Sequence, residues 1–242
     1  MSTPDPPPAA VFRQLRFERP PGATSLLLVR HGESEPARPD VPFDLVDGQG
    51  DPALDPAGEE QARRVATRLA SEPIAAIYAS NLRRTSQTAR PLAEVLGLDV
   101  VVDASLREVH LGEWEGGLFR QRVGERHPVA QRMLAEERWD VIPGAEPMDR
   151  FSARVRAALE GIASRHADQT VAVFTHGGVI AQALAGATGA RRFAFVGVDN
   201  AAISHLVVAA DRWVLRCFND VAHLHAGFAD QSSRDAEGAT KR

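Results

Sequence analysis

Two histidines in this 242-residue chain, His31 and His176, each stand one residue beyond a short apolar run and directly before a glycine. The apolar runs are residues 26–29 and 171–174, and runs of this length are typical of strands buried on both faces of a parallel sheet. Arg30 stands between the first run and its histidine. A guanidinium or an imidazole at the end of a buried strand is costly unless a partner or a ligand uses it. The pattern therefore predicts a site for chemistry at these strand ends.

If the two strands are parallel and central, His31 and His176 emerge at the same edge of the sheet, where ligands bind in open α/β folds. Gly32 and Gly177 follow them and allow the backbone to turn sharply. A helix that begins there presents free backbone N–H groups beside the imidazole, and such groups bind anions. The two strand ends together predict an anion-binding site.

Two further segments carry candidate groups for the same site. Residues 80–89 follow the apolar run 74–79 and place two arginines, Arg83 and Arg84, near the start of a helix at this edge. Farther along the chain stands Glu108. Arginine forks suit phosphate oxygens, and a carboxyl group can move protons during a reaction. These residue types favour chemistry on a phosphate ester.

Four motifs stand in a fixed order along the chain. They are Arg30-His31-Gly32-Glu33; Ser80-x-Leu82-x-Arg84-Thr85-x-Gln87-Thr88-Ala89; Leu106-x-Glu108 with Gly112-x-Trp114-Glu115-Gly116; and His176-Gly177. In this order they resemble the histidine phosphatase superfamily, which includes the cofactor-dependent phosphoglycerate mutases and the related phosphatases. The resemblance runs from about residue 25 to about residue 224 and includes the entry to a first helix at Asp51-x-x-Leu54 with Gly58-x-x-Gln61-Ala62.

The resemblance implies phosphate-ester chemistry that needs neither a metal nor a cofactor. In the implied mechanism, His31 attacks phosphorus through a neutral ring nitrogen and forms a phosphohistidine. Glu108 protonates the leaving oxygen and then accepts a proton from the attacking water. Arg30, Arg84 and a protonated His176 bind the phosphate and stabilise its charge.

Residues around the motifs receive supporting roles. Ser34 either donates its hydroxyl to the phosphate or caps the turn, Gly177 contacts the substrate, and Trp114 forms a wall of the pocket. Arg83 lies beside the motif arginine and is interpreted as a solvated helix residue. Ala37 stands where family members commonly carry an asparagine that helps to hold the phosphate. The loss of one amide donor weakens binding by roughly 1.5–3 kcal/mol if nothing replaces it.

The short spacing between Glu108 and His176 favours a phosphatase, because the related mutases carry a longer insertion there with extra basic residues. A module that binds phosphorylated ligands or a protein partner without turnover is the alternative from another class, and the intact motif residues argue against it. Basic residues in the same stretch either meet an acidic substrate or form a solvated helix face. They are Arg120, Arg122, Arg126, His127 and Arg132.

Strand patterns alternate with helical patterns, which predicts a three-layer α/β/α sandwich around a mostly parallel sheet. Helices are predicted to begin at Asp55-Pro56, at the cap Ser80-Asn81, at Met148 and after His176, and a β-hairpin is predicted over residues 201–218. Residues 105–147 would form a helical excursion over the site. We expect a Pro-rich N-terminal arm over residues 1–24, a single domain over 25–226 and a disordered polar tail over 227–242.

The composition of the chain limits the classes of partner that we expect for it. With 44% apolar residues, 25% charged residues and a net charge of −4, neither nucleic acid nor an anionic membrane is the expected partner. No apolar run approaches the roughly 18 residues of a membrane span, and no secretory signal is seen. The single cysteine, Cys217, is interpreted as a small buried residue, and a reducing, cytoplasmic setting is favoured.

The expected partner is a small phosphorylated substrate, and pairing of edge strands would permit a homodimer. His223 and His225 have the spacing of a ligand pair. They lack the third or fourth ligand that a zinc site requires, which favours a structural role for both.

Overall fold

The computed structural model describes residues 13–224. Its main sheet has six strands in the order β5-β4-β6-β1-β7-β8. The strands are β1 (Thr24–Arg30), β4 (Ile74–Ala79), β5 (Val100–Val102), β6 (Thr170–Thr175), β7 (Ile203–Val208) and β8 (Trp213–Asp220). Strands β5, β4, β6 and β1 run parallel, whereas β7 and β8 add an antiparallel hairpin at one edge. The predicted mostly parallel sheet and its closing hairpin are confirmed.

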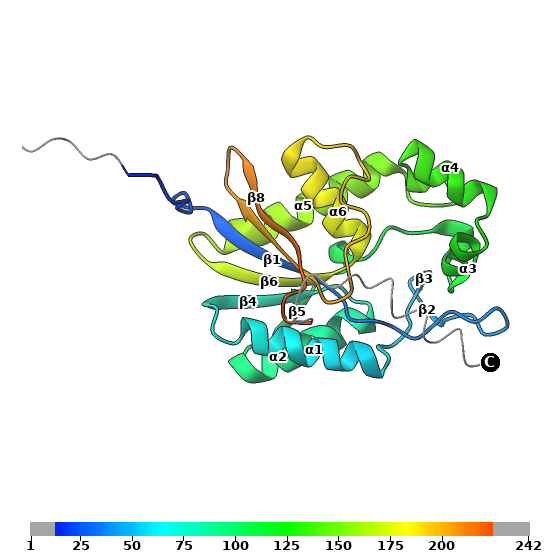
Figure 1. Ribbon diagram of the computed structural model, residues 1–242, viewed down its shortest axis with the longest axis horizontal. Coiled ribbons are helices and arrows are strands. Elements are labelled where there is room, and N and C mark those ends of the chain that lie inside the picture. The colour runs from blue at the N-terminus through cyan, green and yellow to red at the C-terminus, as the bar shows by residue number, and fades with distance from the viewer. Residues whose placement is uncertain (1–12, 225–242) are drawn as a thin grey trace, which may run out of the picture.

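Helices cover both faces of this sheet (Figure 1). Helices α1 (Pro56–Leu69) and α2 (Arg83–Leu96) lie on one face, and α5 (Met148–Arg165) and α6 (Gly177–Thr188) lie on the other. The apolar run of β1 supplies both cores, because Leu26 and Leu28 pack toward α5 and α6 while Leu27 and Val29 pack toward α1 and α2. Two covered faces explain why the run shows no polar alternation.

The two helices on the lower face in Figure 1 begin in different ways. Helix α1 follows the prediction: the side chain of Asp55 accepts the N–H of Gly58 at 2.7 Å, and Pro56 occupies the first turn. Helix α2 does not. Its N-cap residue is Leu82, which has no side-chain cap, and the N–H of Arg83 is instead donated to Oδ1 of Asp51 at 2.8 Å. The predicted cap at residues 80–81 is wrong because a carboxylate from a distant loop takes that place.

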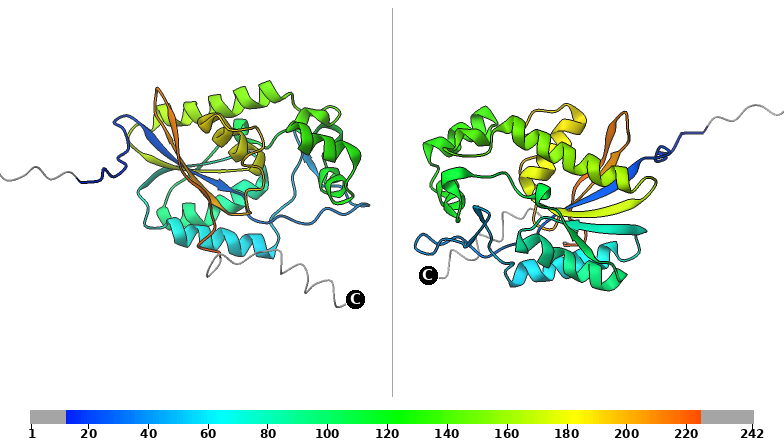
Figure 2. Two further views of the ribbon diagram at one scale, coloured as in Figure 1. Left: turned by 45° about the horizontal axis from the view of Figure 1, so that its top comes forward. Right: turned by 180° about the vertical axis from the view of Figure 1, so that it is seen from behind.

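The chain leaves the sheet twice, and both excursions lie beyond the end of the sheet opposite the N-terminal arm (Figure 2). The first contains the two-stranded ribbon β2 (Leu45–Val46) and β3 (Gln49–Gly50). The second contains the short helices η1 (Ala104–Leu106), η2 (Gly112–Trp114), α3 (Leu118–Gly124), α4 (Pro128–Glu136) and η3 (Trp139–Val141). Tilted ring contacts among Trp114, Phe119 and Trp139 hold the second excursion together.

Residues 13–23 of the predicted arm lie outside helix and strand, and Arg19 ties them to the loop before β6 by donating to the carbonyl oxygens of Gln169 and Asp168. The first twelve residues of that arm and the predicted tail lie outside the described range. Cys217 is exposed, so the prediction of a buried cysteine is wrong: it lies on the outward-facing part of edge strand β8. Among the described helices, none is long and apolar enough to cross a membrane.

Candidate active site

The two histidines meet at one edge of the sheet, as their positions after two buried strands predict. Arg30 and Thr175 are register partners in the parallel pair β1–β6, so the residues that follow them emerge side by side. The backbone N–H of His31 donates to the carbonyl oxygen of Thr175 at 3.0 Å. The ring centroids of His31 and His176 are 5.2 Å apart, and both side chains are buried.

The hydrogen bond of the His31 ring fixes its tautomer. Nδ1 lies 2.7 Å from the carbonyl oxygen of Gly32, and a carbonyl only accepts, so Nδ1 carries the proton and Nε2 carries the free electron pair. Burial, together with the nearby guanidinium groups of Arg84 and Arg30, lowers the pKa of His31 well below its usual value. The side chain is therefore neutral near pH 7, which suits a nucleophile.

The loop after His31 is held close to the start of α1. A Cβ atom on Gly32 would lie 2.6 Å from the carbonyl oxygen of Gly58, and one on Gly58 would lie 1.9 Å from that of Glu33. The N–H of Gly32 donates to Oγ1 of Thr88 in α2 at 3.0 Å. Both glycines are therefore required by close backbone approach, which explains their place in the motifs.

His176 is neutral as well, and the prediction of a protonated His176 is wrong. Nδ1 accepts from Nη2 of Arg84 at 3.3 Å, and Nε2 donates to Oγ of Ser80 at 2.9 Å. Full burial is the largest cause that lowers the pKa of His176 well below its usual value, and the charge of Arg84 is the next. Positive charge at the edge of the sheet therefore comes from arginines alone.

Arg30 and Arg84 are both buried beside the histidine pair. Burial lowers the pKa of Arg84 to about 10, so it remains charged at neutral pH, and its Nη1 donates to the carbonyl oxygen of Gly50 at 3.0 Å. Arg30 donates through Nη1 to the carbonyl oxygen of Val198. Among the described residues, Nε of Arg30 has no hydrogen-bond acceptor although it is buried. A buried N–H without an acceptor is suited to an anionic ligand.

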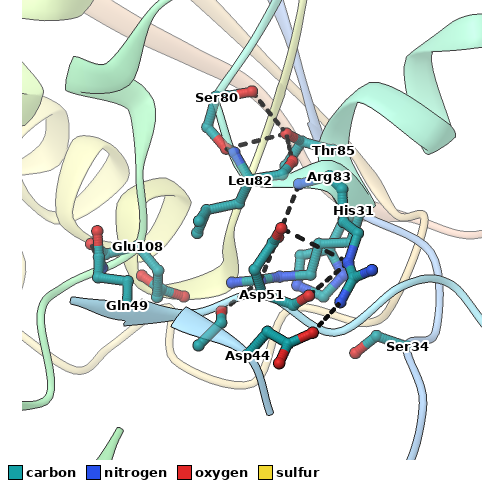
Figure 3. Close-up of polar contacts among 12 residues, drawn as sticks. His31, Ser34, Asp44, Gln49, Asp51, Ser80, Leu82, Arg83, Thr85 and Glu108 are labelled. Atoms are coloured by element: carbon teal, nitrogen blue, oxygen red, sulfur yellow. Dashed lines mark hydrogen bonds and ion pairs between the residues drawn. The ribbon is translucent and has the colours of Figure 1, made fainter. Parts of the chain in front are cut away.

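The contacts of Arg83 are with the loop before α1. Its Nε donates to the carbonyl oxygen of Asp51, and its guanidinium lies 3.5 Å from the Asp51 carboxylate and 4.0 Å from that of Asp44 (Figure 3). Its side chain is 46% exposed, against 9% for Arg84. The structure thus brings Arg84 into the site and uses Arg83 to fasten the loop that carries β2 and β3.

Glu108 lies against the start of α6. Its Oε2 accepts the N–H of Gly178 at 3.0 Å, and its Oε1 accepts the N–H of Val109 at 3.0 Å. A Cβ atom on Gly178 would lie 2.4 Å from Oε1 of Glu108, whereas one on Gly177 would lie 3.5 Å from Nε of Arg30. The motif predicts a role for Gly177, whereas Gly178 is the glycine that lies against Glu108; the pair of glycines is the signal in the sequence for two close approaches at this helix start.

Ser34 and Trp114 line cavities next to these groups. Trp114 borders a cavity of about 80 Å³ together with Arg84 and Glu108. Ser34 borders a second cavity together with Arg30 and His31, and Ala37 lies in the same wall. Oγ of Ser34 accepts from Nη2 of Arg120 at 2.7 Å, which is the hydrogen bond that the structure gives this hydroxyl.

Arg120 borders both cavities, and three other members of its basic cluster have partners elsewhere. Arg122 pairs with Glu125, and Arg132 pairs with Glu136. The ring of His127 packs on Trp114 and accepts the N–H of Val129. Arg120 itself donates to Ser34 and to the carbonyl oxygen of Glu35, both uncharged oxygens. Its charge is therefore available to an anionic ligand.

The described residues contain no group of three histidine, cysteine, aspartate or glutamate side chains that could hold a metal ion. Of the predicted histidine pair, Nε2 of His223 lies 3.1 Å from the carbonyl oxygen of Ala201, and His225 lies outside the described range.

Comparison with known proteins identifies the family of this chain. The family model of the histidine phosphatase superfamily (branch 1) matches residues 26–221. Phosphoglycerate mutase-like protein 4 of Arabidopsis thaliana is 34% identical over 203 residues, which cover 82% of this chain and 86% of that protein. Phosphoserine phosphatase 1 of Hydrogenobacter thermophilus is also 34% identical over 203 residues, covering 82% of this chain and 93% of the relative.

A mycobacterial glucosyl-3-phosphoglycerate phosphatase has a similar solved structure, with a TM-score of 0.66 and 29% identity, over 81% of this chain and 99% of the other. The match in sequence covers the strand ends, helix α2, Glu108 and His176, all of which the structure gathers at one sheet edge. The chain belongs to the histidine phosphatase superfamily (branch 1).

Proposed function

We propose that this protein is a phosphomonoesterase that hydrolyses a small phosphorylated metabolite through a phosphohistidine on His31. The observation that carries the proposal is the tautomer of His31, whose Nδ1–H is held by the carbonyl oxygen of Gly32. Nε2 is left with a free electron pair beside two buried guanidinium groups. A neutral nucleophile next to fixed cations suits attack on a phosphate dianion.

In the first step, Nε2 of His31 forms a bond to phosphorus and the bond from phosphorus to the ester oxygen breaks. Glu108, in its protonated form, gives its proton to that oxygen and the alcohol leaves. Arg30 and Arg84 hold the non-bridging oxygens, with the acceptor-free Nε of Arg30 as one donor. Positioned donors of this kind stabilise charge that spreads over the phosphoryl group in the transition state.

In the second step, Glu108 as carboxylate takes a proton from water. The water oxygen bonds to phosphorus, the bond from Nε2 to phosphorus breaks, and inorganic phosphate is released. His176 faces His31, and its Nε2–H donates to Oγ of Ser80. Because it lies opposite the nucleophile, we assign it a phosphate-binding role. In that role its Nε2–H leaves Ser80 and donates to a phosphoryl oxygen.

Turnover of p-nitrophenyl phosphate by the wild-type protein and by His31→Ala tests the proposal. We expect release of p-nitrophenol by the wild type and at least a thousandfold loss in the variant, since the nucleophile is removed. A quench at alkaline pH, where phosphohistidine survives, should trap labelled phosphate on the wild type alone. Equal turnover by both proteins would refute the assignment.

A phosphoglycerate mutase is the second candidate, because several relatives are named as mutase-like or as probable phosphoglycerate mutases. The stretch between Glu108 and His176 holds α3, α4 and α5 with short connections, which supports the phosphatase. Release of inorganic phosphate from 3-phosphoglycerate should exceed interconversion of 2- and 3-phosphoglycerate. Faster interconversion than release would make the protein a mutase.

The substrate class that the site favours is an ester whose alcohol bears a second anionic group. Glu108 marks the side on which the alcohol leaves, and the cavity there also holds the guanidinium of Arg120. Relatives named for phosphoserine and for glucosyl-3-phosphoglycerate act on esters that carry a carboxylate. A cytoplasmic location and a homodimer remain predictions from the sequence.

A further inference from the structure

The segment that carries Glu108 is held by side chains from distant parts of the chain. After the single turn of η1 it has no regular structure, yet its backbone carbonyl groups are occupied in succession. Oγ1 of Thr175 donates to the carbonyl oxygen of Leu106 at 2.7 Å. Nε2 of Gln49 donates to the carbonyl oxygen of Glu108 at 2.9 Å, and Figure 3 labels both residues. Three carbonyl groups of this segment, including that of Glu108, bind one arginine.

That arginine is Arg154, on helix α5. Its Nη1 donates to the carbonyl oxygens of Ser105 and Arg107, at 2.8 and 2.9 Å, and its Nη2 donates to that of Glu108 at 3.3 Å. On its other side, Nε and Nη2 donate to the two carboxylate oxygens of Glu146, at 3.0 and 2.7 Å. All five N–H groups of the guanidinium are thus used, and each finds a separate acceptor.

Glu146 completes the arrangement. Its side chain is 11% exposed, and the charge of its carboxylate balances that of Arg154. Its Oε2 also accepts the N–H of His110, and its own N–H donates to the carbonyl oxygen of His110 at 2.9 Å. The ion pair of Arg154 and Glu146 therefore holds the backbone on both sides of Glu108, and its two charges cancel.

We propose that Arg154 is a positioning residue for Glu108, which it holds against α6 so that the carboxyl group can donate its proton to the leaving oxygen. This inference rests on the proposed function of Glu108 as the general acid. Only arginine can make these bonds, since lysine carries three donors on one nitrogen and cannot reach both the carbonyl groups and both oxygens of Glu146.

Two esters with different leaving groups distinguish a positioning role of Arg154 from a general structural role. Nitrophenolate departs without a proton, whereas the alkoxide of glycerol 2-phosphate needs one, so only the second ester depends on a well-placed acid. The ratio kcat/KM reports the steps up to departure of the alcohol. A misplaced acid should therefore lower kcat/KM for glycerol 2-phosphate and leave that for p-nitrophenyl phosphate nearly unchanged.

The variants are Arg154→Lys, which keeps the charge, and Glu146→Gln, which removes one charged acceptor and keeps the shape. Arg156→Lys is the matched control, because Arg156 lies on the same helix, is 60% exposed and pairs with Glu160. We expect Arg154→Lys to lower kcat/KM for glycerol 2-phosphate about tenfold or more and that for p-nitrophenyl phosphate less than about threefold. Glu146→Gln should show the same selectivity with a smaller loss, and Arg156→Lys should show none.

Equal losses on both esters, or no loss on either, would overturn the inference. If Arg154→Lys does not fold, as judged by circular dichroism, Glu146→Gln tests the inference instead, through its losses in kcat/KM for the two esters. Failure of the proposed function looks different, because the wild type would then hydrolyse neither ester. In the Glu108→Gln background, Arg154→Lys should no longer change the ratio between the two esters, since the acid it positions is gone.

Discussion

Nδ1 of His176 accepts a hydrogen bond from Nη2 of Arg84 at 3.3 Å. An arginine can only donate, so this bond requires a neutral imidazole, and the Nε2–H of the same ring is committed to Ser80 at 2.9 Å. One contact thus sets the charge of His176 and leaves the guanidinium groups as the cations that meet a phosphate. The same argument places the proton of His31 on Nδ1.

Two buried neutral histidines make stability depend on pH. Because the pKa values of His31 and His176 are lowered in the folded state, the unfolded chain binds protons more readily below the ordinary value of about 6.5. The free energy of unfolding should therefore fall as pH decreases below that value, by at most about 1.4 kcal/mol per pH unit for each group.

Urea denaturation of the wild type and of His176→Asn between pH 7.5 and pH 5 measures this dependence. The variant lacks one of the two titrating groups in the site, so its stability should fall less steeply as pH decreases. Identical pH dependence in both proteins would contradict the assignment of a buried neutral His176.

Gly178→Ala should disturb catalysis more than folding. The added Cβ atom would lie 2.4 Å from Oε1 of Glu108, so the carboxylate must leave the N–H that it accepts. We expect kcat/KM to fall about 10- to 100-fold, since small displacements of a catalytic group have effects of that size. Gly186→Ala is the matched control in the same helix, because no atom other than its chain neighbours and the nearby backbone of α6 lies within 4 Å of its added Cβ.

The control variant should be as active as the wild type and slightly more stable, by about 0.5–1 kcal/mol, because alanine replaces glycine inside a helix. Unchanged kcat/KM in Gly178→Ala would show that Glu108 does not need its place at the start of α6.

Asp51→Ala should destabilise the protein by about 1–2 kcal/mol, as the loss of a helix cap does. The Asp51 carboxylate accepts the N–H of Arg83 at 2.8 Å and lies 4.0 Å from Nη1 of Arg84. We therefore also expect a higher KM for phosphate esters. Asp44→Asn is the control, since the Asp44 carboxylate is 93% exposed and 4.0 Å from Arg83. Equal stability of the two variants, from urea denaturation, would contradict the capping role.

The strand ends could be predicted because a parallel sheet buried on both faces leaves a simple signature, and residues after such strands meet at one edge. The partners of the site residues could not be predicted in this way. Asp51, Gln49 and Arg154 reach the site from a loop, a two-residue strand and the middle of a long helix, where neighbouring residues give no sign of the contact. Their positions depend on tertiary packing.

The charge of His176 could not be predicted from the sequence either, because it too depends on tertiary packing. A histidine beside an expected phosphate is plausibly cationic, and only its complete burial and its bond to Arg84 reverse that expectation. Exposure of Cys217 is a similar case, because the local sequence does not reveal that three successive residues of edge strand β8, Arg216 to Phe218, are left exposed.

Arg120 offers the sharpest test of substrate class. Its guanidinium borders both cavities of the site and donates to the uncharged oxygens of Ser34 and Glu35. If it binds a carboxylate on the alcohol, Arg120→Ala should lower kcat/KM for phosphoserine by about 10- to 150-fold, the equivalent of a charged hydrogen bond of about 1.5–3 kcal/mol. The value for p-nitrophenyl phosphate, which has no second anion, should change less than about threefold.

Arg122→Ala is the matched control, because Arg122 lies two residues along the same helix and pairs with Glu125. It should leave kcat/KM for both esters unchanged. Equal losses on both esters in Arg120→Ala would mean that Arg120 acts on the phosphoryl group or on the loop of Ser34, since the departing alcohol would then make no difference. No loss on either ester would exclude Arg120 from recognition of the substrate.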